Sequence, residues 1–177
     1  ESGNILEGQF VNRNGDTIVN DNDKYRYKNP APLYTIGITS SLNVGHFNFS
    51  FGARANLGQY VYNNVQTDMG YLKRLYGSSK YLSNVNQSAV DLNVEDQANL
   101  TFSDHFITEA SFFRVDHITL GYSFDHLIGK YLNLYTTVQN PFVITKYKGL
   151  DPEIGNGIDN QIYPRPRTYV LGLNVNF

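Results

Sequence analysis

The chain has 177 residues and a formal charge of −2, from 14 Lys and Arg and 16 Asp and Glu. A balance this close to neutral argues against a nucleic-acid-binding protein, because such proteins concentrate positive charge to replace phosphate counterions. The absence of cysteine excludes disulfides, thiolate metal sites and cysteine nucleophiles within the chain. The 14 Tyr and 11 Phe favour strands over helices.

Five segments alternate apolar and polar residues with the period of two that is typical of a β-strand. In the clearest of them, Phe47 and Phe49 would lie on one face of the strand and Asn48 on the other. The third segment changes phase near Asp116, where a β-bulge would bring its apolar residues back onto one face. The predicted strands comprise residues 34–44, 46–57, 110–124, 131–140 and 168–177.

These strands are long, and the connections between them alternate in length. At about ten residues, each strand can cross a membrane at a tilt, whereas strands of soluble proteins have about five to six. Long connections alternate with short turns, which is typical of outer-membrane β-barrels with their extracellular loops and periplasmic turns. No segment is apolar enough for a membrane-spanning helix. The expected extracellular loops comprise residues 12–32, 58–109 and 141–167.

Five strands are too few to close a membrane barrel, because bacterial single-chain barrels have about eight or more. An open edge in lipid would leave backbone groups without hydrogen-bond partners. The sequence therefore predicts an all-β fold, in which this chain contributes antiparallel strands to a larger transmembrane β-barrel. A soluble, carbohydrate-binding β-sandwich is the alternative, since its sheets also have one apolar face each.

Three motifs in the last third of the chain are distinctive. The first is ASFFRV followed by ITLGYSF, in residues 110–124. The second is QNPF followed by TKYKGLDPE, in residues 139–153, and the third is the ending LGLNVNF, in residues 171–177. In this order they resemble the antepenultimate strand, the loop after the penultimate strand and the last strand of the SusC/RagA-type TonB-dependent transporters. The resemblance is specific from Ala110 onward, and it is fainter between Asn12 and Leu57.

The resemblance implies that the chain is the C-terminal part of a plugged barrel of about 22 strands. It implies TonB-dependent import of oligosaccharides, or of oligopeptides, across the outer membrane of Bacteroidota together with a SusD-like surface lipoprotein that caps the barrel. The plug and the segment that contacts the TonB complex would lie upstream of this chain, and the C-terminus would be periplasmic. A siderophore or cobalamin receptor of the TonB-dependent class is a further alternative. No enzymatic activity is expected.

One segment has the spacing of a twelve-residue calcium loop. Carboxylate, amide and carbonyl oxygens are the ligands that Ca²⁺ prefers, and they recur at the required intervals. However, Thr17 replaces the glycine of such loops, and Asp23 replaces the final glutamate. An Asn/Gly-rich turn without metal is the alternative. The candidate calcium ligands are Asn12, Asn14, Asp16, Ile18, Asn20 and Asp23.

Polar side chains on the lumen side of the predicted barrel, and tyrosines of the longest loop, are candidates for substrate binding. Asn48, Arg54 and Asn56 share the polar face of one strand, where they would bind a polar solute or contact the wall or plug. Tyr62 and Tyr71 would stack on sugar rings, or else pack within their own loop. No arrangement of residues typical of a catalytic site stands out.

Overall fold

The structure is a computed structural model that describes residues 6–77, 81–127, 130–160 and 162–176. The terminal Phe177, expected to end the last strand, lies outside the described residues. The chain divides into two compact units, here named the strand unit and the loop unit. The strand unit comprises Ala31–Tyr60, Glu109–Glu153 and Ile162–Phe177, and the loop unit comprises Glu1–Pro30, Val61–Thr108 and Ile154–Gln161.

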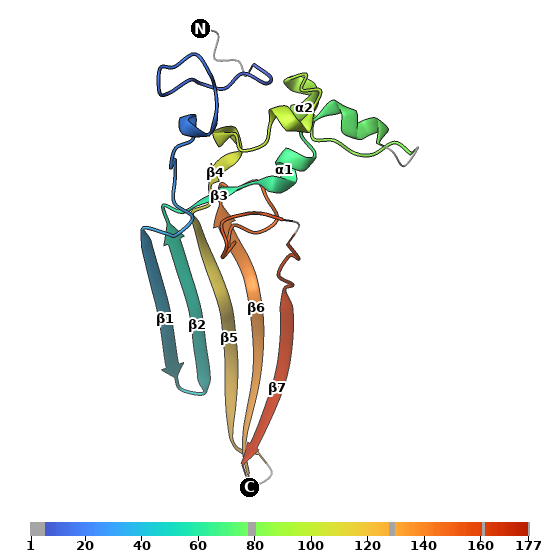
Figure 1. The fold of residues 1–177 in the computed structure, drawn as a ribbon. Coiled ribbons are helices and arrows are strands. Elements are labelled where there is room, and N and C mark those ends of the chain that lie inside the picture. The colour runs from blue at the N-terminus through green and yellow to red at the C-terminus, as the bar shows by residue number, and fades with distance from the viewer. Residues whose placement is uncertain (1–5, 78–80, 128–129, 161, 177) are drawn as a thin grey trace. The chain divides into compact units, whose positions relative to one another are not determined.

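The strand unit contains a five-stranded antiparallel sheet with the order β1-β2-β5-β6-β7 (Figure 1). Each strand pairs with its sequence neighbour in the sheet, and a tight turn at Gly45, with φ of 56°, joins the first two. The expected all-β fold is thus confirmed. The strands are β1 (Tyr34–Val44), β2 (Phe47–Leu57), β5 (Phe112–Leu127), β6 (Lys130–Thr145) and β7 (Thr168–Asn176).

The bulge predicted near Asp116 is present. Gly52 of β2 pairs with His117, whereas the next residue of β2 pairs with Val115, so that Asp116 is left without a partner. On the other side of β5 the register shifts at the same place. The extra residue keeps the apolar side chains of β5 on one face despite the change of phase in the sequence.

Residue 141 was expected to begin the last long connection, but β6 continues to Thr145. The reason is the same irregularity in the pairing. Val115 pairs with Phe142, and the next paired residue of β6 toward its beginning is Gln139, so that Pro141 lies between two paired positions. Pro141 therefore lies in the bulge, where its missing N–H costs no ladder hydrogen bond. The long connection accordingly begins after Thr145.

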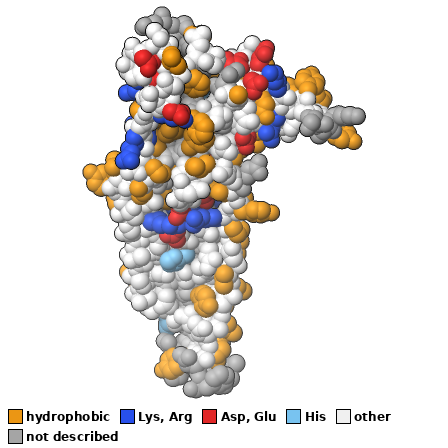
Figure 2. All heavy atoms as spheres, in the orientation of Figure 1, with side chains coloured by type: hydrophobic (Ala, Val, Ile, Leu, Met, Phe, Trp, Pro, Cys, Tyr) orange, Lys and Arg blue, Asp and Glu red, His pale blue; other side chains and the backbone are white. Residues whose placement is uncertain are grey.

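The two faces of the sheet differ in polarity. Side chains of the polar face bond to one another, for example the Thr119 and Thr137 hydroxyls at 2.9 Å. Over the strands in Figure 2, charged side chains gather in one band, and the surface below this band is mainly uncharged. Large apolar side chains on the opposite face are exposed within the chain, among them Ile36, Ile38, Leu42, Phe47, Phe49, Leu120, Leu134, Leu171 and Leu173.

The loop unit folds around a small core of its own. Val94, Leu100 and Phe106 are buried together, and Tyr62 and Tyr71 pack against them. None of the described helices is long and apolar enough to cross a membrane. The remaining elements are β3 (Tyr60–Tyr62), β4 (Ile107–Glu109), the helices α1 (Asn64–Asp68) and α2 (Gln87–Asp91), and the 3-10 turns Asp21–Asp23, Leu72–Tyr76, Gln97–Asn99 and Asp104–Phe106.

A glycine of β7 accommodates an aromatic ring from the neighbouring strand. Tyr135 of β6 pairs directly with Gly172, and a Cβ atom added at Gly172 would overlap the Tyr135 ring. Gly172→Ala should therefore lower the free energy of unfolding by about 1–3 kcal/mol, since overpacking forces side chains to move. Gly172→Ala combined with Tyr135→Ala should recover most of this loss, as measured by urea titration.

Gly37→Ala in β1 is the matched control, because a Cβ atom at that position meets no atom within 4 Å. Both variants are made in the complete protein, and the stability of Gly37→Ala should stay near that of the unmodified protein. Equal losses from Gly37→Ala and Gly172→Ala would contradict the proposed packing of Tyr135 on Gly172.

Candidate functional site

Two arginines face each other on neighbouring strands of the polar face. Arg54 of β2 pairs directly with Arg114 of β5 in the sheet register. Like charges at directly opposed positions destabilise a sheet, and the Arg114 side chain is only 4% exposed. The pair can therefore exist only with carboxylates placed against it.

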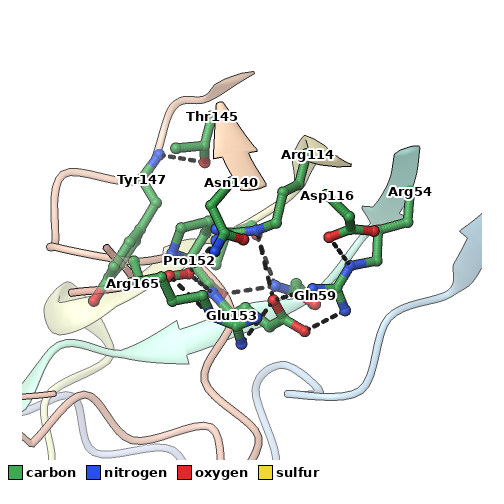
Figure 3. A network of polar contacts seen from close by, with 12 residues as sticks. Arg54, Gln59, Arg114, Asp116, Asn140, Thr145, Tyr147, Pro152, Glu153 and Arg165 are labelled. Atoms are coloured by element: carbon green, nitrogen blue, oxygen red, sulfur yellow. Dashed lines mark hydrogen bonds and ion pairs between the residues drawn. The ribbon is translucent and has the colours of Figure 1, made fainter. Parts of the chain in front are cut away.

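Carboxylates from two segments supply this compensation (Figure 3). The Arg54 Nη1 and Nη2 atoms donate to the Glu153 oxygens Oε1 and Oε2 at 2.6 and 2.9 Å, a bidentate pair. Arg54 Nε donates to Asp116 Oδ1 at 3.1 Å. Arg114 Nη2 donates to Asp151 Oδ1 at 2.6 Å, and the Asp151 side chain is 6% exposed. Bidentate and charge-assisted bonds of this kind are strong and fix geometry.

Arg165, from the segment leading into β7, completes the cluster. Its Nη2 lies 2.9 Å from Glu153 Oε2, and its Nε lies 3.4 Å from Asp151 Oδ2. Three arginines thus face three carboxylates, and the cluster carries no net charge. We name it the arginine–carboxylate network, consisting of Arg54, Arg114, Asp116, Asp151, Glu153 and Arg165.

Backbone contacts hold the acidic segment of the network in place. The Glu153 backbone N–H donates to Asp151 Oδ1 at 2.9 Å, which closes a turn around Pro152. The buried Gln59 side chain donates to the carbonyl oxygens of Ala110 and Pro152, at 2.8 and 2.9 Å. The base of the last long connection is therefore fastened to the polar face of the sheet.

The network is suited to holding structure or contacting a polar solute, and not to acid–base catalysis. Arg114 and Asp151 are closed to solvent, so they are not accessible to a ligand. Arg54, Asp116 and Arg165 are 32%, 37% and 41% exposed, and they form the accessible rim. A solute that reaches the polar face would meet guanidinium donors and carboxylate acceptors there.

The three candidates on β2 have different surroundings. Arg54 belongs to the network, so its guanidinium is already paired with two carboxylates. Asn48 Nδ2 donates to Ser123 Oγ at 3.1 Å, and the same oxygen accepts from Asn133 Nδ2 at 2.9 Å. The Oδ1 atom of Asn56 is buried and accepts no hydrogen bond from the described residues. Substrate contact by these three side chains stays a prediction.

The two tyrosines predicted to bind substrate contribute to the core of the loop unit. Tyr62 and Tyr71 pack against the cluster of Val94, Leu100 and Phe106. The Tyr62 hydroxyl accepts a hydrogen bond from Thr67 Oγ1 at 3.3 Å. Packing within the loop therefore accounts for both residues, and stacking on a sugar by either ring stays a prediction.

In the candidate calcium loop the side-chain oxygens accept hydrogen bonds from the loop itself. Asp23 accepts from the backbone N–H groups of Asn20 and Arg13, at 2.9 and 2.7 Å, and these bonds lower the pKa of its carboxyl group. Asp16 Oδ1 accepts from the Ile18 N–H at 2.8 Å. Among the described residues no three His, Asp or Glu side chains are grouped as a metal site. Calcium binding stays a prediction, in which the ion would add to or replace these bonds.

Sequence reasoning did not anticipate the network as a unit. Arg114 and the segment from Asp151 to Glu153 lie in the motifs that carry the family resemblance, but no role was assigned to them. The sequence contains one signal of this cluster, because Arg54 and Arg114 are the arginines of two predicted strands that alternate polar and apolar residues. Only the strand register shows that these two arginines are neighbours, and the alternation pattern does not give the register.

Removing the charge of Arg114 should strongly destabilise the strand unit. Arg114→Met leaves the nearly buried Asp151 without its closest partner, and breaking a buried ion pair costs about 3–5 kcal/mol. The free energy of unfolding from a urea titration measures the loss. Lys73→Gln is the matched control, since it breaks a pair with Asp96 whose side chains are 64% and 43% exposed. A loss no greater than that of Lys73→Gln would show that the network is not a stabilising element.

No protein-family model matches the chain. The chain is 44% identical over 185 residues to the TonB-dependent receptor SusC of Bacteroides thetaiotaomicron, a match that includes all of this chain and 18% of the receptor. It is 27% identical to a TonB-dependent receptor of Formosa agariphila, over 95% of the chain and 18% of that receptor. The chain therefore spans about a fifth of the length of these relatives.

The fold is similar to solved structures of the RagAB peptide importer. The closed-closed state matches with a TM-score of 0.71 over 95% of this chain and 20% of the solved chain, at 21% identity. The open-open state matches with a TM-score of 0.69 over 92% of this chain and 19% of the solved chain, at 20% identity. This similarity supports the assignment of the strands to a larger barrel. From the identity over its whole length and from its fold, the chain is a segment of a SusC/RagA-type TonB-dependent receptor.

Proposed function

We propose that the chain forms the C-terminal part of the wall of an outer-membrane barrel that imports nutrients with energy from TonB. The observation that carries this proposal is the 44% identity to a TonB-dependent receptor over the whole chain. The sheet supports it, because β1 and β7 each have one hydrogen-bonded neighbour in the described residues. In lipid such edges need further strands, which the rest of a receptor would supply. A transport role also agrees with the expectation that the chain is not an enzyme.

The exposed apolar face favours a membrane wall over a β-sandwich. Ile36, Leu42 and Leu173 are 47%, 57% and 56% exposed, although a sandwich would bury such side chains against a second sheet. Lipid tails would cover this face in a barrel, and the polar face with its network would line the lumen. In this arrangement the connections after β2 and β6 are extracellular and the C-terminus is periplasmic.

The proposed cargo is an oligosaccharide, with an oligopeptide as the second candidate. A SusD-like surface lipoprotein would capture the cargo, and TonB would act through a plug outside this chain. The second candidate rests on the similarity to RagAB, which is described as a peptide importer. A siderophore or cobalamin receptor is less favoured, because the motifs after β6 resemble the SusC/RagA type.

Arginine should be tolerated on the polar face and rejected on the apolar face. Phe49→Arg or Leu134→Arg would place a charge against lipid tails, which costs about 2–4 kcal/mol at the membrane midplane. Asn48→Arg and Asn133→Arg are the controls, since they lose only hydrogen bonds to Ser123. The fraction of receptor assembled in the outer membrane, read from heat-modifiable migration on gels, should fall for the first pair alone. Equal effects on both faces would contradict the assignment of the lipid side.

The transport role is tested in the native bacterium. Deletion of the receptor gene should abolish uptake of either labelled oligosaccharides or labelled oligopeptides, and deletion of TonB should have the same effect. Restoring the gene on a plasmid should restore uptake. Unchanged uptake of both kinds of cargo in the deletion strain would refute the proposed function.

A further inference from the structure

The strand unit contains a cavity on the apolar face of its sheet, where β2 and β6 end and β5 begins (Figure 1). Its volume is about 290 Å³, near the lower limit of the about 300–1,000 Å³ of small-molecule sites. Leu57, Phe113 and Ile144 are among its lining residues. Phe113 pairs with Ala55 on one side and with Ile144 on the other. Leu57 follows Ala55 by two residues, so its side chain lies on the same apolar face. We name this the wall cavity.

The hydroxyl groups that line the wall cavity are engaged by the strand unit itself. The Ser111 hydroxyl donates to Glu109 Oε1 at 2.8 Å and accepts from the Gly58 N–H at 2.9 Å. The Thr145 hydroxyl donates to the Ser111 carbonyl oxygen at 2.8 Å and accepts from the Tyr147 N–H at 3.1 Å. A polar solute would compete with these bonds, whereas a hydrocarbon chain leaves them intact. The wall cavity therefore suits an apolar occupant.

An exposed lysine lines the wall cavity just beyond the end of β6. Lys146 directly follows this strand, and no described residue forms a hydrogen bond or ion pair with its ammonium group. Lys148, two residues further along, is also exposed. Glu109 is the one carboxylate among the lining residues, and it already accepts the bond from Ser111. Positive charge therefore exceeds negative charge at this end of the cavity, which favours an anionic group.

The place of the wall cavity in the membrane indicates where such an occupant comes from. In a barrel wall the apolar face contacts lipid tails, and the connections after β2 and β6 lie outside the cell. The wall cavity would then lie where the hydrocarbon region meets the head groups of the outer leaflet. Lipopolysaccharide is the main lipid of this leaflet, and its anchor, lipid A, carries several acyl chains on a phosphorylated head group. This chemistry matches an apolar cavity with lysines at its outer end.

We propose that the wall cavity binds lipid A, with one acyl chain packed against Phe113 and Ile144 and a phosphate group paired with Lys146. This inference rests on the proposed function, since it requires that the apolar face of the sheet is the lipid side of a barrel wall. It adds a binding site on the outside of the wall, separate from the polar face along which a cargo would pass. A bound lipid A would cover Ile144, which is 63% exposed within the chain.

The test titrates the full receptor, purified in detergent and freed of bound lipid, with purified lipid A, and native mass spectrometry counts the bound lipid. Lys146→Gln should weaken binding of the first lipid A about fivefold, because it removes one cation near the head group. Ile144→Trp should weaken it about tenfold or more, because the larger ring fills the cavity and displaces methylene groups of the chain. Both side chains are exposed, so both variants should assemble as the unmodified receptor does.

Two matched variants control for the loss of charge and for the added ring. Lys73→Gln removes a cation of the loop unit whose side chain is 64% exposed. Leu171→Trp introduces the same ring on the apolar face of β7, at a side chain that is 76% exposed and does not line the wall cavity. Neither control should change the affinity for lipid A.

Three results would overturn the proposed lipid site. They are an affinity that Lys146→Gln or Ile144→Trp leaves unchanged, an equal loss of affinity in either control, and phosphatidylglycerol that binds as tightly as lipid A. Each is distinguishable from failure of the proposed function. A receptor whose deletion abolishes uptake, but whose wall cavity binds no lipid A, would refute the lipid site alone.

Discussion

Arg54 and Arg114 occupy directly opposed positions on two strands, and much of the strand unit is arranged to neutralise them. Their charges repel each other, and the Arg114 side chain is almost completely shielded from water. The bulge of β5 supplies Asp116, and the connection after β6 supplies Asp151 and Glu153. Because these partners come from distant segments, the register of β2 on β5, the bulge and the base of the last long connection depend on one another.

The bulge explains how a proline lies inside a long strand. Asp116 is unpaired on β5, and Pro141 lies opposite, where no ladder hydrogen bond is required of it. Asn140, with φ of 50°, takes the left-handed conformation that asparagine tolerates better than most residues. Pairing then resumes and carries β6 on to Thr145. This extension leaves only a short link before Asp151, so the acidic segment begins close to the sheet that holds it.

The sequence pattern predicted the features that depend on residues close together in the sequence. It did not predict the contacts between residues that are far apart in the sequence. Alternation with a period of two is a local property, and it located the strands and the bulge at Asp116. Pro141 was expected to end a strand, because its tolerance depends on a bulge set by the opposite strand. The ion pair of Arg54 with Glu153 joins residues that are 99 positions apart, and a local alternation of residue types contains no information about such a pair. Candidate ligands are likewise identified in a sequence by residue type alone, because a sequence does not show their hydrogen-bond partners.

The aromatic residues of the long connections show why residue type alone does not identify a binding site. Tyr62 and Tyr71 have the same chemistry as Tyr25, yet they pack against buried Val94, Leu100 and Phe106. A long connection with its own core can hold other rings, such as Phe102, in fixed positions at its surface. A ring that is already ordered loses little conformational freedom when a ligand binds, which lowers the entropic cost of binding. The core that partly buries two tyrosines thus decides which aromatic rings of the long connections remain exposed.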